Sequence, residues 1–127
     1  MTDATIVLDD RVERVTRVRT IATDEWRAAI ALHGEFDIAN AHELRDELAE
    51  HIDAGRRVIR VDLQRVSFMD STAIGELIEA THRCNAEHGS LILTNISAGL
   101  YRVLSRTGFV KRLLIDTAGG FGREVSA

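Results

Sequence analysis

The chain has 127 residues, 45% of them hydrophobic and 28% charged, which suits one globular domain. Its formal net charge of −4 argues against direct nucleic-acid binding, which favours a basic face. No apolar stretch approaches the ~20 residues that span a bilayer, and Met1-Thr2-Asp3 does not resemble the start of a signal peptide. The single cysteine, Cys84, excludes an internal disulfide, so we expect a cytoplasmic protein without membrane insertion.

The first part of the chain predicts a hairpin. Residues 1–12 are charge-rich and are interpreted as an N-terminal extension. Apolar and polar residues then alternate over Val15–Ile21 and Trp26–Leu32, with Thr23-Asp24-Glu25 as the turn between them. In the second strand this alternation places Trp26 on the apolar face with Ala28, Ile30 and Leu32.

A helix follows the motif Gly34-Glu35-Phe36-Asp37, which breaks the strand pattern. Asn40 and Glu43 have the spacing of a capping box, in which each side chain satisfies one free N–H group of the first turn. Gly55 is expected to end this helix.

Strands and helices alternate through the rest of the chain. In order, we expect a buried strand over Arg57–Leu63, a loop over Ser67–Ala73, a helix from about Ser71 to Glu87, a strand at Leu91–Leu93, a helix capped by Ser97 and stopped by Gly108, a strand at Leu113–Ile115, and a glycine-rich tail over 118–127. This order predicts one α/β domain over 13–117, with helices covering a mostly parallel sheet that begins with an antiparallel pair.

The start of the helix at Ser71 is the first candidate site. Asp70 is the expected N-cap, and the backbone N–H groups of the first turn lack intrahelical partners. Ser71 and Thr72 can simply be first-turn residues of a capped helix. Alternatively, Ser71 is a regulatory phosphorylation site, because a phosphate is well accommodated at a helix N-terminus and would repel a docked partner.

The motif Gly34-Glu35-Phe36-Asp37 is the second candidate site. Gly34 can end a strand while Asp37 solvates the following turn. Alternatively, this loop and the loop at Ser71 share the edge of the sheet where ligands bind in α/β folds.

The sequence contains no complete set of residues for a metal site or for the catalytic sites considered. His82, Cys84 and His88 project in different directions, so we expect no metal site. Ser71 lacks the Gly-x-Ser-x-Gly turn of hydrolases, and the glycines do not form a phosphate-binding loop followed by lysine. Phosphoaspartate receivers need a lysine after the last strand, whereas Lys111 precedes it. The protein is therefore not expected to be an enzyme.

The two motifs together, Gly34-Glu35-Phe36-Asp37 and Val66 to Gly75, resemble the STAS domain family, in particular bacterial anti-sigma factor antagonists. The resemblance implies a four- or five-stranded sheet with helices packed mainly on one side. It also implies that an anti-sigma factor that is a serine kinase binds the unphosphorylated domain, releases a sigma factor, and is itself released when Ser71 is phosphorylated.

The resemblance extends to individual residues and partners. Asp37 and Asp70 would border the phosphoserine, Gly34 and Glu35 would join the partner-binding surface, and Thr72 would be an alternative acceptor. A phosphatase would reset the switch, and the kinase would supply ATP and Mg²⁺, so no cofactor is expected on this chain. The same fold could instead serve as a stand-alone subunit of a membrane lipid-transport complex or as a signalling scaffold.

Overall fold

A computed structural model describes residues 17–118, 120 and 121. The predicted extension at 1–12, the first two residues of the strand predicted from Val15, and the end of the predicted tail at 122–127 lie outside the described residues.

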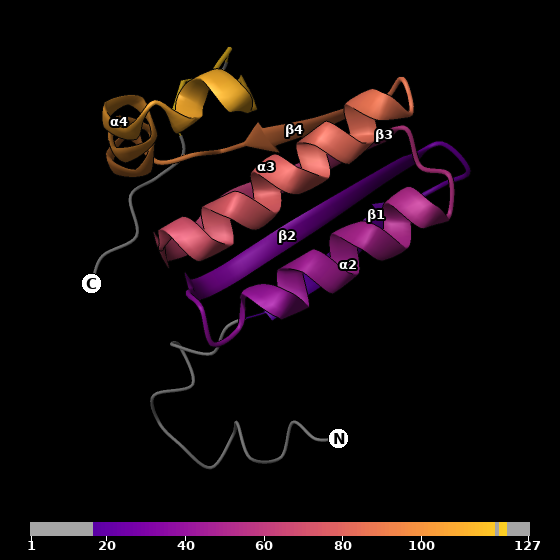
Figure 1. Ribbon diagram of the computed structural model, residues 1–127, viewed down its shortest axis with the longest axis horizontal. Helices are drawn as coiled ribbons and strands as arrows, with labels where there is room; N and C mark the ends of the chain where they lie inside the picture. Colours follow the sequence, from indigo (N-terminus) through magenta and orange to yellow (C-terminus); the bar gives the residue numbers. More distant parts are fainter. Residues whose placement is uncertain (1–16, 119, 122–127) are drawn as a thin grey trace.

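The fold is built on one sheet of five strands in the order β1-β2-β3-β4-β5, of which Figure 1 labels β1 to β4. The pair β1–β2 is antiparallel, and every later pair is parallel. The strands are β1 (Arg17–Thr23), β2 (Arg27–Phe36), β3 (Val58–Met69), β4 (Ser90–Thr94) and β5 (Leu114–Asp116). The predicted α/β class, with a mixed sheet that starts with an antiparallel hairpin, is confirmed.

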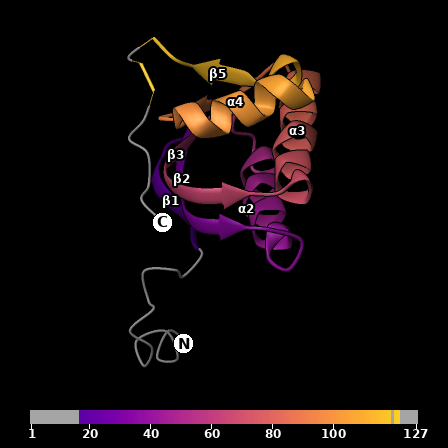
Figure 2. The same cartoon turned by 90° about the vertical axis from the view of Figure 1, so that its left-hand side faces the viewer.

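Two helices cover one face of this sheet. Figure 2 shows α2 (Ala41–Asp53) and α3 (Ser71–Ala86) on the same side of the curved strands, and within the described part of the chain no helix covers the opposite face. The third helix, α4 (Ala98–Thr107), follows β4 and buries Leu104; a short 3₁₀ helix, Phe109–Arg112, leads to β5. None of the described helices is long and apolar enough to cross a membrane.

The predicted apolar stripes of α2 and α3 form the core with the inward side chains of the sheet. Leu44, Leu48 and Leu77 are almost fully buried. Burial of one such leucine contributes roughly 1.5–3 kcal/mol. His51 is a buried polar exception on α2: its Nε2 lies 2.8 Å from Thr20 Oγ1, and the Thr20 hydroxyl donates to Glu47, so these polar groups join α2 to β1.

The strand β2 is longer than predicted. The motif at Gly34 was expected to end the strand, but β2 continues to Phe36, which is fully buried. Gly34 has φ +103°, and the pairing with β3 shifts register between Gly34 and Glu35. A glycine at this irregularity adopts positive φ without steric cost, so the strand bends and continues.

Two further strand predictions are wrong. Residues Ser67 to Met69 belong to β3 and not to a loop, because they extend its parallel pairing with the longer β2. Trp26 is 61% exposed and precedes β2, so it does not share the buried face of that strand.

The predicted caps are confirmed for α4 and wrong for α2. Ser97 Oγ accepts a hydrogen bond from Leu100 N–H at 3.1 Å, and Gly108 ends α4 with φ +84°, both as predicted. The capping box at Asn40 is wrong. The Asn40 side chain makes no cap hydrogen bond to α2; its Oδ1 accepts from Asp37 N–H and its Nδ2 donates to the Glu35 carbonyl, so Asn40 closes the preceding turn instead.

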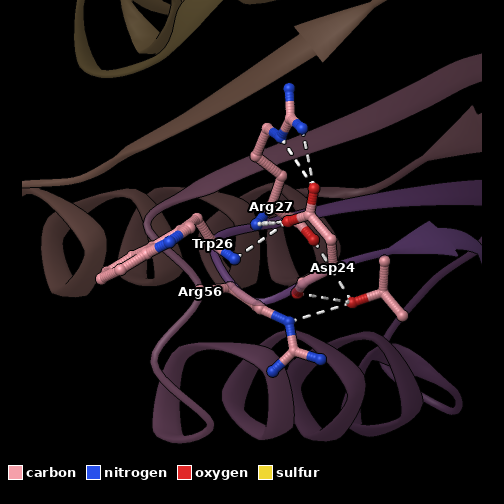
Figure 3. A network of polar contacts seen from close by, with 5 residues as sticks. Asp24, Trp26, Arg27 and Arg56 are labelled. Atoms are coloured by element: carbon pink, nitrogen blue, oxygen red, sulfur yellow. Dashed lines mark hydrogen bonds and ion pairs between the residues drawn. The ribbon is translucent and has the colours of Figure 1, made fainter.

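Asp24 organises the hairpin turn between β1 and β2 (Figure 3). Its Oδ1 accepts from the backbone N–H groups of Trp26 and Arg27 at 2.9 and 2.7 Å, and its Oδ2 accepts from the Arg27 guanidinium at 2.8 Å. Arg56, which follows α2, donates to Thr23 Oγ1 at 2.9 Å. The predicted turn is thus a hydrogen-bonded unit tied to the next helix.

Candidate functional site

Asp70 joins the two candidate loops at the carboxyl ends of β2 and β3. Its N–H donates to the Phe36 carbonyl at 3.0 Å, which extends the pairing of the two strands by one residue. Its Oδ1 accepts from Ala73 N–H at 3.0 Å, as expected of an N-cap, and its Oδ2 accepts from Ile38 N–H at 3.1 Å. One carboxylate therefore caps α3 and also holds the turn before α2.

Ser71 and Thr72 occupy the first turn of α3, and both are exposed. The first intrahelical bond runs from Ile74 N–H to the Asp70 carbonyl, so the N–H groups of Ser71 and Thr72 precede the helical ladder. Between residues 17 and 118, no hydrogen bond engages either hydroxyl. An exposed hydroxyl at the positive end of a 16-residue helix is well placed to accept a phosphate.

In the motif Gly34-Glu35-Phe36-Asp37, the last residue forms the turn that leads into α2. Asp37 Oδ1 accepts from Ala39 N–H at 3.0 Å, and the Asp37 carbonyl accepts from Ala41 N–H at 2.8 Å. Glu35 is exposed on β2, whereas Gly34 is buried within that strand. The expectation that both motifs share one edge agrees with the Asp70–Ile38 bond, and the partner-binding roles of Gly34, Glu35 and Asp37 stay predictions.

Exposed apolar side chains flank Ser71. Ile38 is 77% exposed in the turn that Asp70 holds, and Phe68 is 53% exposed near the end of β3. A groove of about 270 Å³ lies between Phe68 and Val103 of α4. We call Ile38, Phe68 and Val103 the apolar rim. These exposed apolar groups beside a polar site make this end of the molecule a candidate interaction surface.

The residues considered for metal or thiol chemistry lie elsewhere. Cys84 is buried on the inner face of α3, and this burial raises the pKa of its thiol. In the stretch from residue 17 to residue 121, apart from Gly119, no three His, Cys, Asp or Glu side chains gather as metal ligands. Cys84 is 2% exposed and belongs to the hydrophobic core.

Two features of this site escaped the sequence reasoning. The bond from Ile38 N–H to Asp70 depends on the parallel register of β2 and β3, which local patterns do not determine. The apolar rim combines a turn, a strand end and a helix that are distant in sequence. The sequence offered one signal: Phe68 and Met69 are consecutive apolar residues, and in a regular strand they cannot both face the core.

Comparison with known proteins agrees with this geometry. Residues 17–119 match the STAS domain. The chain is 34% identical over 79 residues to the anti-sigma-B factor antagonist of Bacillus subtilis (strain 168), a match covering 62% of this chain and 72% of the relative. It is 32% identical over 91 residues to the anti-sigma-B factor antagonist of Listeria monocytogenes, covering 72% and 80%. The chain belongs to the STAS domain family, and these relatives are regulatory antagonists of anti-sigma factors.

Solved structures agree on the fold. The unphosphorylated form of the anti-sigma factor antagonist SpoIIAA superposes with a TM-score of 0.68 at 24% identity, covering 80% of this chain and 89% of that one. Its phosphorylated Bacillus form gives a TM-score of 0.63 at 22% identity, covering 80% and 92%.

Proposed function

We propose that this protein is an anti-sigma factor antagonist controlled by phosphorylation of Ser71. Unphosphorylated, it binds an anti-sigma factor over Ser71 and the apolar rim, and a sigma factor is freed. The observation that carries this proposal is the exposed Ser71 hydroxyl at the capped start of α3, next to exposed Ile38 and Phe68. The names of the relatives support the same function.

The phosphate acts on the interface and leaves the fold intact. It adds about −1.5 to −2 charges, which the N–H groups and dipole of α3 accommodate. A partner seated on the apolar rim would face that charge in a desolvated contact and dissociate. The anti-sigma factor acts as the serine kinase and supplies ATP and Mg²⁺, Thr72 is the alternative acceptor, and a phosphatase restores binding. The chain itself is a cytoplasmic regulator and not an enzyme.

The test combines phosphate mapping with binding. The protein is incubated with its cognate kinase-type anti-sigma factor and Mg-ATP, and the modified residue is located by mass spectrometry. Binding is then measured by calorimetry for wild type, Ser71→Asp and Asn85→Asp. The control adds one negative charge at an exposed position about 20 Å along the same helix.

We expect one phosphate on Ser71, none on the Ser71→Ala protein, and weaker binding for Ser71→Asp by about tenfold or more, with Asn85→Asp unchanged. If neither Ser71 nor Thr72 carries phosphate and Ser71→Asp binds as wild type does, the proposed switch is wrong.

A further inference from the structure

The helix-free face of the sheet carries a cationic hollow of about 380 Å³. Arg17 and Arg19 of β1, His33 of β2 and Arg65 of β3 line it, and Ala31 lies among them. Val18 and Ile30, which are neighbouring residues in β1 and β2, belong to the core or pack against it on the other face. We call this feature the arginine hollow.

Strand register brings these side chains into neighbouring positions. Arg17 pairs with His33 across β1 and β2, and His33 pairs with Arg65 across β2 and β3. Adjacent strands lie about 4.8 Å apart, so the backbones of Arg17 and Arg65 are separated by roughly 10 Å, within reach of two long side chains. In the next row Arg19 pairs with Ala31, whose small side chain leaves the space open.

The three arginines of the hollow lack the carboxylate partners that hold other arginines of the described residues. Five arginines elsewhere are held by acidic side chains, namely Arg27 by Asp24, Arg45 by Asp46, Arg57 by Glu87, Arg60 by Asp116 and Arg83 by Asp53. No ion pair within residues 17–118 engages Arg17, Arg19 or Arg65.

One carboxylate, Asp62, also lines the hollow. Its Oδ1 accepts from Gln64 N–H at 2.8 Å and from Asn95 Nδ2 at 3.1 Å, so this oxygen is directed to its own strand and to the loop after β4. Arg17 and Arg19 lie on β1 and Arg65 on β3, so an anion bound between these strands would be attracted by all three guanidinium groups.

We propose that the arginine hollow binds a small ligand with two or more phosphate groups. Guanidinium groups match pairs of phosphate oxygens with two parallel hydrogen bonds, and three arginines line this hollow. A hollow of this volume lies in the range of small-molecule sites, whereas an acidic protein segment would need a longer, shallower surface. In a protein of net charge −4, this local concentration of positive charge attracts anions to one place.

Inorganic pyrophosphate is the probe, titrated by calorimetry and by amide chemical shifts. We expect shift changes at Arg17, His33 and Arg65, and weaker binding by about tenfold in Arg17→Gln and in Arg65→Gln. Arg106→Gln is the control, because it removes the same charge from an exposed position on α4 and should bind as wild type does.

A second variant tests the hollow without changing its charge. Ala31→Leu fills the open space between the arginines and should weaken binding as well, with the fold checked by its amide spectrum. Equal affinity of wild type, Arg17→Gln and Arg65→Gln for pyrophosphate would overturn the proposal. So would tight binding of an oligoglutamate peptide combined with no response to pyrophosphate, since that result assigns the face to an acidic protein segment.

Discussion

At the scale of single residues, Asp70 has two structural tasks, and only one of them was expected. Its Oδ1 caps α3 through Ala73 N–H, and its Oδ2 binds the N–H of Ile38 in the turn before α2. Ser97 only caps a helix: its Oγ accepts from Leu100 N–H at the start of α4. The pair therefore allows the cost of losing a cap to be separated from the cost of losing the link between the two turns.

We expect Asp70→Ala to lower the free energy of unfolding by about 2 kcal/mol and Ser97→Ala by about 1 kcal/mol. Asp70→Asn should fall between wild type and Asp70→Ala, since its amide oxygen can cap α3 while its NH₂ group cannot accept from Ile38. Urea denaturation of the four proteins measures these differences. Equal losses for Asp70→Ala and Ser97→Ala would show that the bond to Ile38 contributes no stability.

At the scale of elements, the β1–β2 hairpin depends on an ionised Asp24. The hydrogen bonds from the Arg27 side chain, and then those from the Trp26 and Arg27 backbone N–H groups, lower the pKa of Asp24 from 3.8 to about 2. Between these two values the unfolded chain binds more protons than the folded one, so stability rises with pH across this window. The contribution of Asp24 is complete above about pH 4 and is lost as the pH falls toward 2.

Replacing Asp24 with Asn should therefore destabilise the protein at neutral pH, and the difference from wild type should shrink as the pH falls below about 4. Urea midpoints recorded between about pH 2 and pH 7 test this. Asp46→Asn, which removes an exposed carboxylate paired only with Arg45, is the control and should change stability little at any pH. A pH-independent effect of Asp24→Asn would contradict the role of the ionised carboxylate.

At the scale of the whole molecule, large apolar side chains are exposed at both ends of the sheet. Phe68 belongs to the apolar rim beside Ser71, whereas Trp26 is 61% exposed at the hairpin end. The proposed partner contacts only the first of these. Because interface energy concentrates in a few aromatic anchors, Phe68→Ala should weaken binding of the anti-sigma factor by about tenfold or more.

Trp26→Ala is the matched control for Phe68→Ala and should leave that affinity unchanged. Calorimetric titrations of both variants, with circular dichroism to confirm folding, provide the measurement. A larger loss for Trp26→Ala than for Phe68→Ala would indicate that the anti-sigma factor binds at the hairpin end of the sheet. That result would contradict the proposed interface beside Ser71.

Local sequence patterns predicted the order of elements well, because the stripes of α2 and α3 and the apolar runs of β3 and β4 are strong and regular. They failed where the backbone departs from regularity. Gly34 allows β2 to continue through a register shift, and Asn40 bonds backward to Asp37 instead of forward into α2. The helix start at Ser71 with Asp70 as its N-cap was predicted correctly, because a helix start is a local feature. The Ile38–Asp70 bond and the arginine hollow were not, since both depend on pairing between distant segments.

The two outer strands of the sheet, β1 and β5, are poor sites for a strand of another copy to add to. At one edge β1 carries Arg17 and Arg19 and shifts register between Thr20 and Ala22. At the other edge β5 has only three residues, and its Asp116 is paired with Arg60. Charge, irregularity and shortness all discourage a strand of another copy from adding to the sheet. Within the described residues, both edges of the sheet therefore resist the addition of a further strand.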